Sequence, residues 1–192
     1  MRHGQTVFNL EMKERGTDPG VPDPGLTELG RQQALDAARK MEQSDELPVA
    51  ILTSPYRRTL ETAEIVASVI DRPIVIEPLI REHVYFSCDQ GTHRSELQKF
   101  WPQHDFSLLP EVWWSHDDES HDIVTARAMA FHDKARKLVK EDEPWLVVSH
   151  WAFLLSLTGY KFLNGEYVAM DPDHLDPQSV IPPELPVKQK LS

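Results

Sequence analysis

The sequence contains a single cysteine, Cys88, so no disulfide can form within the chain. This cysteine usage fits a reducing compartment. No apolar run approaches the about 20 residues that a bilayer-crossing helix needs, and no signal-peptide pattern opens the sequence. We therefore expect a cytoplasmic protein with no membrane partner.

Positive charge is also scarce, because 20 Lys and Arg residues face 31 Asp and Glu residues and leave a net charge of -11. Proteins that bind nucleic acids need clustered positive charge, so this composition argues against a nucleic-acid partner. A small anionic substrate remains compatible if a few arginines gather in one cleft. The length of 192 residues fits one domain with a proper core.

Metal-binding patterns are absent as well. The sequence has nine histidines, yet neither an HExxH motif nor paired cysteines occur. The densest group of candidate ligands, at residues 116–121, is explained more simply as a charged loop that caps a helix starting near Asp122. We expect no metal and no other cofactor.

Apolar residues recur at helical spacing in four segments, 28–43, 55–70, 122–140 and 151–158. Ser54 and Pro55 are expected to begin the second of these helices as its N-cap and first residue. Short apolar runs predict buried strands at 49–53, 73–76 and 145–149. Because strands and helices alternate, we predict an α/β fold, a three-layer α/β/α sandwich with a mainly parallel sheet.

The remaining segments are less regular. Residues 10–26 are rich in proline and glycine and are expected to form a loop, and residues 166–170 are expected to form an edge strand after an Asn-Gly turn. Residues 83–118 read as a long insertion, and such insertions are usually lids or binding elements. We therefore expect one domain over 1–170 and a proline-rich tail over 171–192.

Four short motifs point to phosphate chemistry, and they follow one another as Arg2-His3-Gly4, Ser54-Pro55-Tyr56-Arg57-Arg58, Arg81-Glu82 and Ser149-His150. An arginine offers a planar fork of donors that matches phosphate oxygens. A neutral imidazole is a nucleophile at physiological pH. In this order the motifs resemble those of the histidine phosphatase superfamily, the phosphoglycerate-mutase-like proteins.

The resemblance implies a role for each motif. His3 would be the nucleophile that forms a phosphohistidine, and Glu82 would act as general acid toward the leaving oxygen and then as base toward water. That acid role needs a carboxyl group with a raised pKa, which a partly buried site can supply. The resemblance places the phosphate-binding pocket at Arg2, Asn9, Arg58 and His150, and His150 is also expected to be catalytic.

Motifs within the insertion indicate one branch of this superfamily. Its Cys-Asp, Arg-Ser and Trp-Trp pairs resemble those of phosphoglycerate-mutase-like proteins from plants and fungi, which are generally phosphatase-like. Arg94 and Trp113 are the candidate substrate residues of this lid. A solvent-exposed role for Arg94 and a packing role for Trp113 stay open.

Two departures from the family pattern stand out. Trp151 replaces the small residue that usually follows the second histidine, which is expected to crowd the pocket. The family also places a β-strand directly before the Arg-His-Gly motif, and only Met1 precedes it here. We therefore expect a fold whose first strand is missing, with weak stability and little activity unless about six apolar residues precede Met1.

The expected function is metal-independent hydrolysis of a phosphate monoester through a phosphohistidine on His3. The expected partner is a small phosphorylated metabolite, and the chain is expected to be a monomer or a homodimer. Two alternatives remain open, a phosphoglycerate-type mutase and a catalytically impaired homologue that only binds phosphate.

Overall fold

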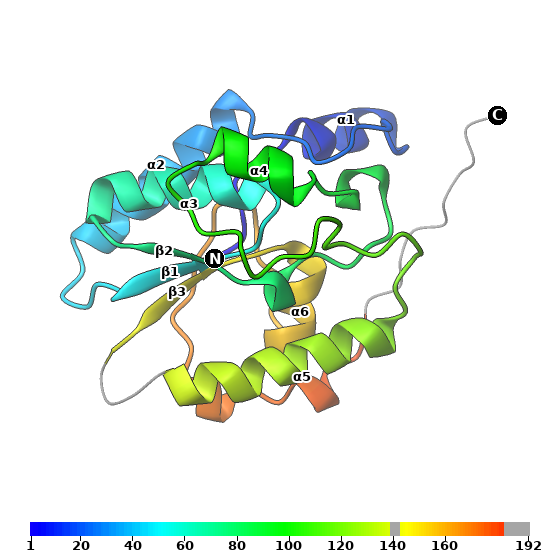
Figure 1. Cartoon of the computed structure of the whole chain (residues 1–192). Helices are drawn as coiled ribbons and strands as arrows, with labels where there is room; N and C mark the ends of the chain where they lie inside the picture. The colour runs from blue at the N-terminus through cyan, green and yellow to red at the C-terminus, as the bar shows by residue number, and fades with distance from the viewer. Residues whose placement is uncertain (139–142, 183–192) are drawn as a thin grey trace.

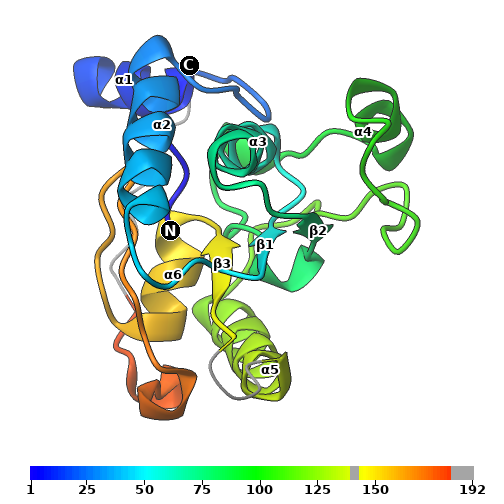
Figure 2. The ribbon, with the colours of Figure 1, turned by 90° about the vertical axis from the view of Figure 1, so that its left-hand side faces the viewer.

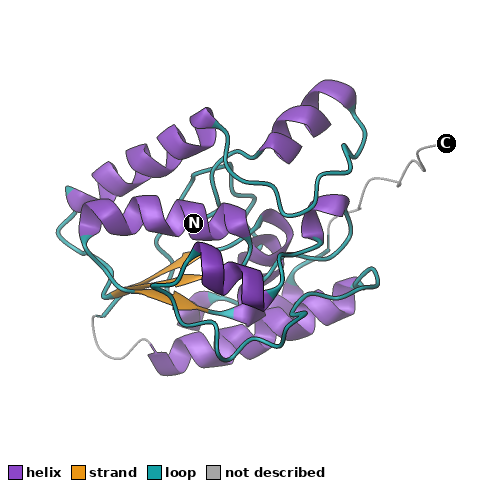
Figure 3. Cartoon of the chain, turned by 45° about the horizontal axis from the view of Figure 1, so that its top comes forward, coloured by secondary structure: helices purple, strands orange, loops and turns teal. Residues whose placement is uncertain are grey.

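The computed structural model describes residues 1–138 and 143–182 and has an α/β fold built on a small open parallel sheet (Figure 1). The sheet contains β1 (Ala50–Thr53), β2 (Ile74–Ile76) and β3 (Trp145–Val148) in the order β2-β1-β3. Both neighbour pairs run parallel. The predicted strands and their parallel pairing are confirmed. Figure 3 shows how small this sheet is beside the helices and loops around it.

Helices lie on both faces of the sheet (Figure 2). Helices α2 (Glu28–Glu42) and α3 (Arg57–Ile70) cover one face, and α5 (His121–Leu138) and α6 (Trp151–Thr158) cover the other. Neighbouring strand residues point to opposite faces, so Ile51 packs in the core beneath α2 and α3 while Leu52 packs in the core above α5 and α6. The four predicted helices are confirmed, apart from the end of the 122–140 segment, of which residues 139–140 lie outside the described residues.

The prediction of a loop over 10–26 is wrong at its start, because α1 (Val7–Arg15) occupies residues 7–15. A capping box begins this helix. The Thr6 hydroxyl accepts from the Asn9 backbone N–H, and the Asn9 side-chain oxygen accepts from the Thr6 backbone N–H. Gly16, at φ 70°, ends it. Only Phe8 of the helix is buried, so there is no apolar periodicity for the sequence to reveal.

Two local predictions are also wrong. Helix α3 begins at Arg57 with Tyr56 as N-cap and no side-chain capping bond, so Ser54 does not cap it. The Ser54 hydroxyl is buried and instead contacts His150 Nε2 at 2.8 Å. No strand forms at 166–170 within the described part of the chain; the Glu166 carbonyl accepts one bond from the Arg2 N–H.

The insertion and the segment after 170 both pack on the domain. The insertion carries α4 (Arg94–Phe100), and its Leu97, Phe106 and Trp113 form a small core with Tyr56 and Leu60. After 170, two short 3₁₀ turns (Pro172–His174 and Pro177–Ser179) lie against α5. The predicted boundary between domain and tail stays a prediction, and residues 183–192 lie outside the described residues.

No helix within residues 1–138 and 143–182 has the length and apolar character that crossing a membrane requires.

The first residues of the chain continue the sheet beyond β3. Arg2 pairs in parallel with Ser149, and the His3 N–H donates to the Ser149 carbonyl at 3.0 Å. This pairing brings His3 beside His150, with 5.3 Å between their ring centroids. The Arg-His-Gly motif therefore lies at the carboxyl end of β3, where open α/β sheets bind ligands.

Two glycines let this first segment approach α2. A Cβ on Gly4 would lie 2.2 Å from the Gly30 carbonyl oxygen, and a Cβ on Gly30 would lie 2.0 Å from the Gln5 carbonyl oxygen. Both obstacles are backbone atoms, so neither can move aside cheaply. The glycine of the Arg-His-Gly motif thus serves backbone packing against a helix in this fold.

Gly30→Ala should therefore destabilise the protein, although a glycine-to-alanine change inside a helix normally stabilises it by about 1 kcal/mol. Overpacking against the backbone should lower the free energy of unfolding by about 1–3 kcal/mol. The measurement is the thermal unfolding midpoint, with Lys40→Ala at an exposed position of the same helix as control. A Gly30→Ala protein as stable as the control would show that the close approach is not tight.

Candidate active site

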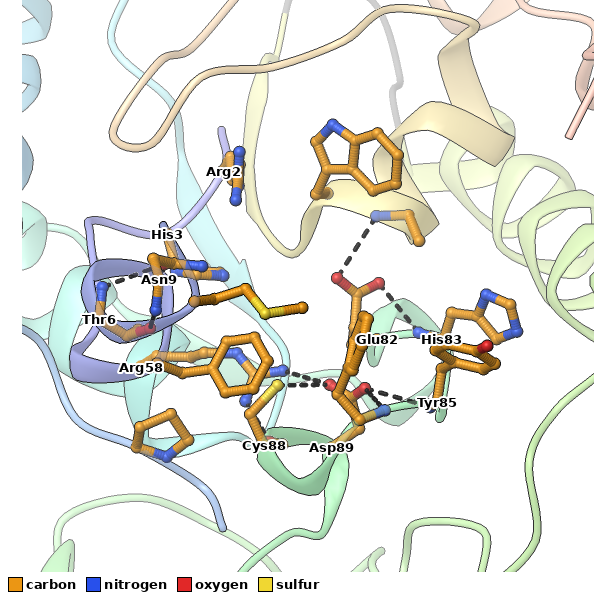
Figure 4. A pocket seen from close by; sticks show the side chains of 16 residues that line it. Arg2, His3, Thr6, Asn9, Arg58, Glu82, His83, Tyr85, Cys88 and Asp89 are labelled. Carbon is orange, nitrogen blue, oxygen red and sulfur yellow. Dashed lines mark hydrogen bonds and ion pairs between the residues drawn. The ribbon is translucent and has the colours of Figure 1, made fainter. Parts of the chain in front are cut away.

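A cavity of about 340 Å³ opens at the carboxyl ends of β1 and β3 (Figure 4). The predicted site residues that line it are Arg2, His3, Asn9, Arg58 and Glu82. Figure 4 shows His3 and Arg58 on one side of the view and Glu82 on the other. The fold thus brings together residues from the first segment, from α1, from α3 and from the position just before the insertion.

The hydrogen bond of His3 defines which ring nitrogen can react. Its Nδ1 lies 2.7 Å from the Gly4 carbonyl oxygen, and because a carbonyl only accepts, Nδ1 carries the proton. Nε2 therefore holds the lone pair in the neutral ring. Burial, together with the positive charges of Arg58 and Arg2, lowers the pKa of His3 well below 6.5. The imidazole is accordingly neutral and nucleophilic at pH 7.

Arg58 is buried and held by three different groups. Its Nε donates to His150 Nδ1 at 3.1 Å, its Nη1 to the Cys88 carbonyl at 2.7 Å and its Nη2 to Asp89 Oδ1 at 3.1 Å. A guanidinium has five N–H donors, so two remain for a ligand. Arg58 is therefore oriented in advance, which is the arrangement that phosphate recognition requires.

His150 lies behind the cavity wall and does not line the cavity. Because its Nδ1 accepts from Arg58, the ring proton sits on Nε2 and is donated to the Ser54 hydroxyl. Burial and the nearby charge of Arg58 lower the pKa of His150 well below its usual value. His150 is thus placed to orient Arg58, while direct contact with phosphate would require one of its two bonds to break.

Asp89 is a site residue to which the sequence analysis assigns no role. It is buried, lines the cavity and contacts Arg58 through Oδ1, while Oδ2 accepts the backbone N–H groups of Tyr85 and Phe86. Burial raises its pKa to about 6 despite the opposing charge of Arg58. The Cys-Asp pair was noted as part of the resemblance, but its contact with Arg58 is tertiary and leaves no local pattern.

Glu82 lies at the N-terminus of α6. Its carboxylate accepts the backbone N–H groups of His83 at 2.9 Å, Phe153 at 3.1 Å and Ala152 at 3.3 Å. Trp151, which precedes these two helix residues, lines the cavity as the sequence led us to expect. The three donors fix the position of the Glu82 carboxyl group across the cavity from His3.

Arg2 and Asn9 complete the polar lining. Arg2 donates to the Phe162 carbonyl at 3.0 Å, and burial lowers its pKa to about 10 while Glu82 opposes that shift. It therefore keeps its charge at pH 7. The Asn9 side-chain oxygen accepts from Thr6, so its NH₂ group is the part suited to an anion.

The structure does not bring Arg94 or Trp113 to this cavity. Arg94 is partly exposed and lies 3.6 Å from Glu111. Trp113 is buried against Tyr56, with 4.7 Å between ring centroids, and donates to the Thr92 carbonyl. Trp113 therefore packs the core of the insertion. Among the described residues there is also no group of three or more side chains suited to hold a metal ion.

Comparison with known proteins assigns the family. Residues 1–181 match the model of the histidine phosphatase superfamily (branch 1), and the chain belongs to this superfamily. A glucosyl-3-phosphoglycerate phosphatase of Mycolicibacterium vanbaalenii is 27% identical over 82% of this chain and 70% of its own length. A 2,3-bisphosphoglycerate-dependent phosphoglycerate mutase of Bartonella henselae is 29% identical over 53% of this chain and 48% of its own.

A solved structure supports the same assignment. The structure of mycobacterial glucosyl-3-phosphoglycerate phosphatase with VO3 is 25% identical, covers 81% of this chain and 75% of its own, and has a TM-score of 0.55. The predicted superfamily is confirmed, and its named members are phosphatases and phosphoglycerate mutases, so the chain belongs to a superfamily of enzymes.

The His3 imidazole should remain neutral and protonated on Nδ1 as the pH falls through 6.5. Since its folded-state pKa lies below the value of about 6.5 expected for an unfolded chain, the unfolded chain takes up the proton first and acidification lowers stability. Imidazole ¹⁵N NMR would measure this, with the His3 signal assigned as the one missing in His3→Gln. Titration of that signal at or above pH 6.5 would contradict the assignment.

Proposed function

We propose that the protein hydrolyses a phosphate monoester without a metal ion, through a phosphohistidine on Nε2 of His3. The observation that carries the proposal is the bond from Nδ1 of His3 to the Gly4 carbonyl, which leaves the lone pair of Nε2 beside Arg2 and Arg58. A nucleophile and two cations around one cavity match the demands of phosphoryl transfer.

The first step forms the phosphohistidine. Arg2, Arg58 and the amide of Asn9 bind the phosphate oxygens, and Nε2 of His3 attacks phosphorus as the bond to the alcohol oxygen breaks. Glu82 gives its proton to that oxygen, and the alcohol leaves. The arginines stabilise the charge on the equatorial oxygens, which accounts for much of the catalysis in such reactions.

The second step reverses the role of Glu82. Its carboxylate takes a proton from water, the oxygen of that water attacks phosphorus, and the bond to Nε2 breaks. Inorganic phosphate and the original enzyme result. The three N–H groups fix the position of the Glu82 carboxyl group, so that the same group can face both the leaving alcohol and the incoming water.

A mutase is the second candidate, and the identity to the Bartonella mutase favours it. A mutase would return the phosphoryl group to an acceptor such as phosphoglycerate and release 2-phosphoglycerate from 3-phosphoglycerate, whereas a phosphatase releases free phosphate. A homologue that binds phosphate without turnover would do neither. An assay that separates these products distinguishes all three.

The proposal includes the finer predictions made from the sequence. These are a three-layer α/β/α sandwich, a place in the plant and fungal-type branch, a cytoplasmic location, and a small phosphorylated metabolite as substrate of a monomer or homodimer. The helices on both faces of the sheet support the first, and the motifs of the insertion support the second.

His3→Ala should abolish aryl phosphate hydrolysis, measured by release of nitrophenol in excess EDTA. The fold should survive, because the backbone of His3 and not its ring pairs with Ser149. The control is His93→Ala, which removes a half-exposed histidine outside the cavity. Wild-type turnover in His3→Ala would overturn the proposed nucleophile.

Glu82→Gln should slow hydrolysis of alkyl phosphates by about a hundredfold or more, because their leaving oxygens need a proton. Nitrophenolate leaves readily without a proton, so the rate of nitrophenyl phosphate hydrolysis should fall much less. The ratio of kcat values for the two substrates measures the effect, with the exposed Glu96→Gln as control. An equal loss on both substrates would assign Glu82 a structural role instead.

A further inference from the structure

One carboxylate of the charged group at 116–121 lies inside the protein. Glu119 is buried, and its Oε2 accepts from Arg127 Nη2 at 2.9 Å and from the Val84 backbone N–H at 3.1 Å. Arg127, on α5, is buried as well. A buried anion and a buried cation therefore meet beside the segment that carries Glu82.

The Arg127 guanidinium binds the backbone on both sides of this carboxyl-bearing residue. Its Nη1 donates to the Leu79 carbonyl at 2.9 Å and to the Arg81 carbonyl at 2.8 Å, and its Nη2 donates to the Glu82 carbonyl at 3.1 Å. Together with the bond to Glu119, these contacts use every terminal N–H of the guanidinium. One side chain of α5 thus fixes the main chain at the proposed general acid.

The segment depends on such support because it has no regular structure of its own. Residues 81–84 belong to neither a helix nor a strand, so their backbone groups lack the partners that a helical turn or a ladder would supply. Arg127 binds two of their carbonyls. Glu119 accepts the Val84 N–H through its carboxylate and donates its own N–H to the Val84 carbonyl at 3.0 Å. The backbone around Glu82 is therefore held from two directions.

The location of this ion pair indicates a role beyond stability. Removing two charges from water costs about as much free energy as their attraction returns, so a buried ion pair contributes little net stability. Within the described part of the chain, two Arg–carboxylate pairs have both side chains buried, namely Arg58–Asp89 and Arg127–Glu119. The first supports the phosphate-binding arginine, and the second supports the segment of Glu82. Both therefore lie where catalysis needs fixed geometry.

We propose that Arg127 and Glu119 are positioning residues for the general acid: they hold the backbone of residues 81–84 so that the Glu82 carboxyl group faces the leaving oxygen. The inference rests on the proposed function, and specifically on the acid role of Glu82. Neither Arg127 nor Glu119 lines the cavity, so neither touches the substrate. The N–H groups of α6 fix the carboxyl group itself, while the ion pair fixes the main chain that carries it.

The test is the variant Arg127→Lys, which keeps the positive charge but lacks the planar fork that binds several acceptors at once. The Glu82 carboxyl group should then be misplaced, and an error of about 1 Å can cost about a hundredfold in rate. We expect kcat for glycerol 3-phosphate, an alkyl phosphate, to fall by about tenfold or more. For nitrophenyl phosphate, whose leaving group needs no proton, kcat should fall by about twofold or less. Equal losses on both substrates would overturn the inference.

A double-mutant cycle determines whether Arg127 acts through Glu82. In a protein that already carries Glu82→Gln, there is no carboxyl proton left to position. Arg127→Lys should therefore leave glycerol 3-phosphate hydrolysis almost unchanged in that background, since residues that act as one unit are not additive. A full further loss in the Glu82→Gln background would show that Arg127 acts elsewhere, and would also overturn the inference.

Arg72→Lys is the matched control. Arg72 also binds two backbone carbonyls, those of Pro48 and Asp71, but at the amino end of the sheet. This variant should leave the ratio of the two kcat values within about twofold of wild type, because distant sites act independently. A change in the ratio as large as that of Arg127→Lys would show that the effect is not specific to Glu82 and would count against the inference.

Glu119→Gln provides a second variant if Arg127→Lys does not fold, which circular dichroism would reveal. The amide keeps the shape of the carboxylate and weakens its charge-assisted bonds. The ratio of kcat for glycerol 3-phosphate to that for nitrophenyl phosphate should fall by about threefold. An unchanged ratio in the folded Glu119→Gln protein would overturn the inference.

Two measurements separate this inference from the proposed function. Wild-type protein that does not hydrolyse nitrophenyl phosphate, or Glu82→Gln that slows both substrates equally, would refute the proposed mechanism and the inference with it. Wild-type turnover and a selective loss in Glu82→Gln, combined with equal losses in Arg127→Lys, would refute the inference alone. A selective loss in both variants is the result that we expect.

Discussion

The buried guanidinium of Arg58 is the group on which the rest of the site depends. A charge in the interior is tolerated only when it is paired and hydrogen-bonded, and Arg58 finds its partners in His150, Asp89 and the Cys88 carbonyl. These partners come from the segment that follows β3 and from the insertion, while Arg58 itself belongs to α3. One cation therefore ties three parts of the chain into a single phosphate-binding wall.

Burial also determines the protonation state of the two histidines beside Arg58. His3 and His150 lie side by side next to cations, so both are held neutral. Neutrality has opposite uses in the two rings: it leaves His3 a lone pair for attack, and it lets His150 accept from Arg58. The Gly4 carbonyl and the Arg58 guanidinium then select which nitrogen of each ring carries the proton.

Much of the framework could be predicted from the sequence because its signals are local. The strands are short continuous apolar runs and four of the helices have apolar faces, so these two patterns are enough to predict where strands and helices lie. Helix α1 has no such face and is defined by its caps, which is why it was missed. Ser54-Pro55 has the pattern of a helix start, yet its hydroxyl is used by a residue 96 positions away.

Part of the site could also be predicted, because several of its residues belong to local sequence motifs. His3, Arg2, Arg58 and Glu82 belong to the motifs, Asn9 stands where the resemblance places a pocket residue, and the cavity brings all five together. The contact of Asp89 with Arg58 and the packing of Trp113 on Tyr56 depend on how the insertion folds back. No periodicity within the insertion predicts how it folds back, so neither of these two contacts could be derived from the sequence alone.

Trapping the covalent intermediate tests the central claim most directly, namely that Nε2 of His3 takes the phosphoryl group. The full chain would be mixed with ³²P-labelled phosphomonoester, quenched within milliseconds, digested and mapped by mass spectrometry. The account predicts a label that is labile to acid and stable to base, carried by the peptide that contains His3. Turnover with no label there, or with a label that is stable to acid, would contradict it.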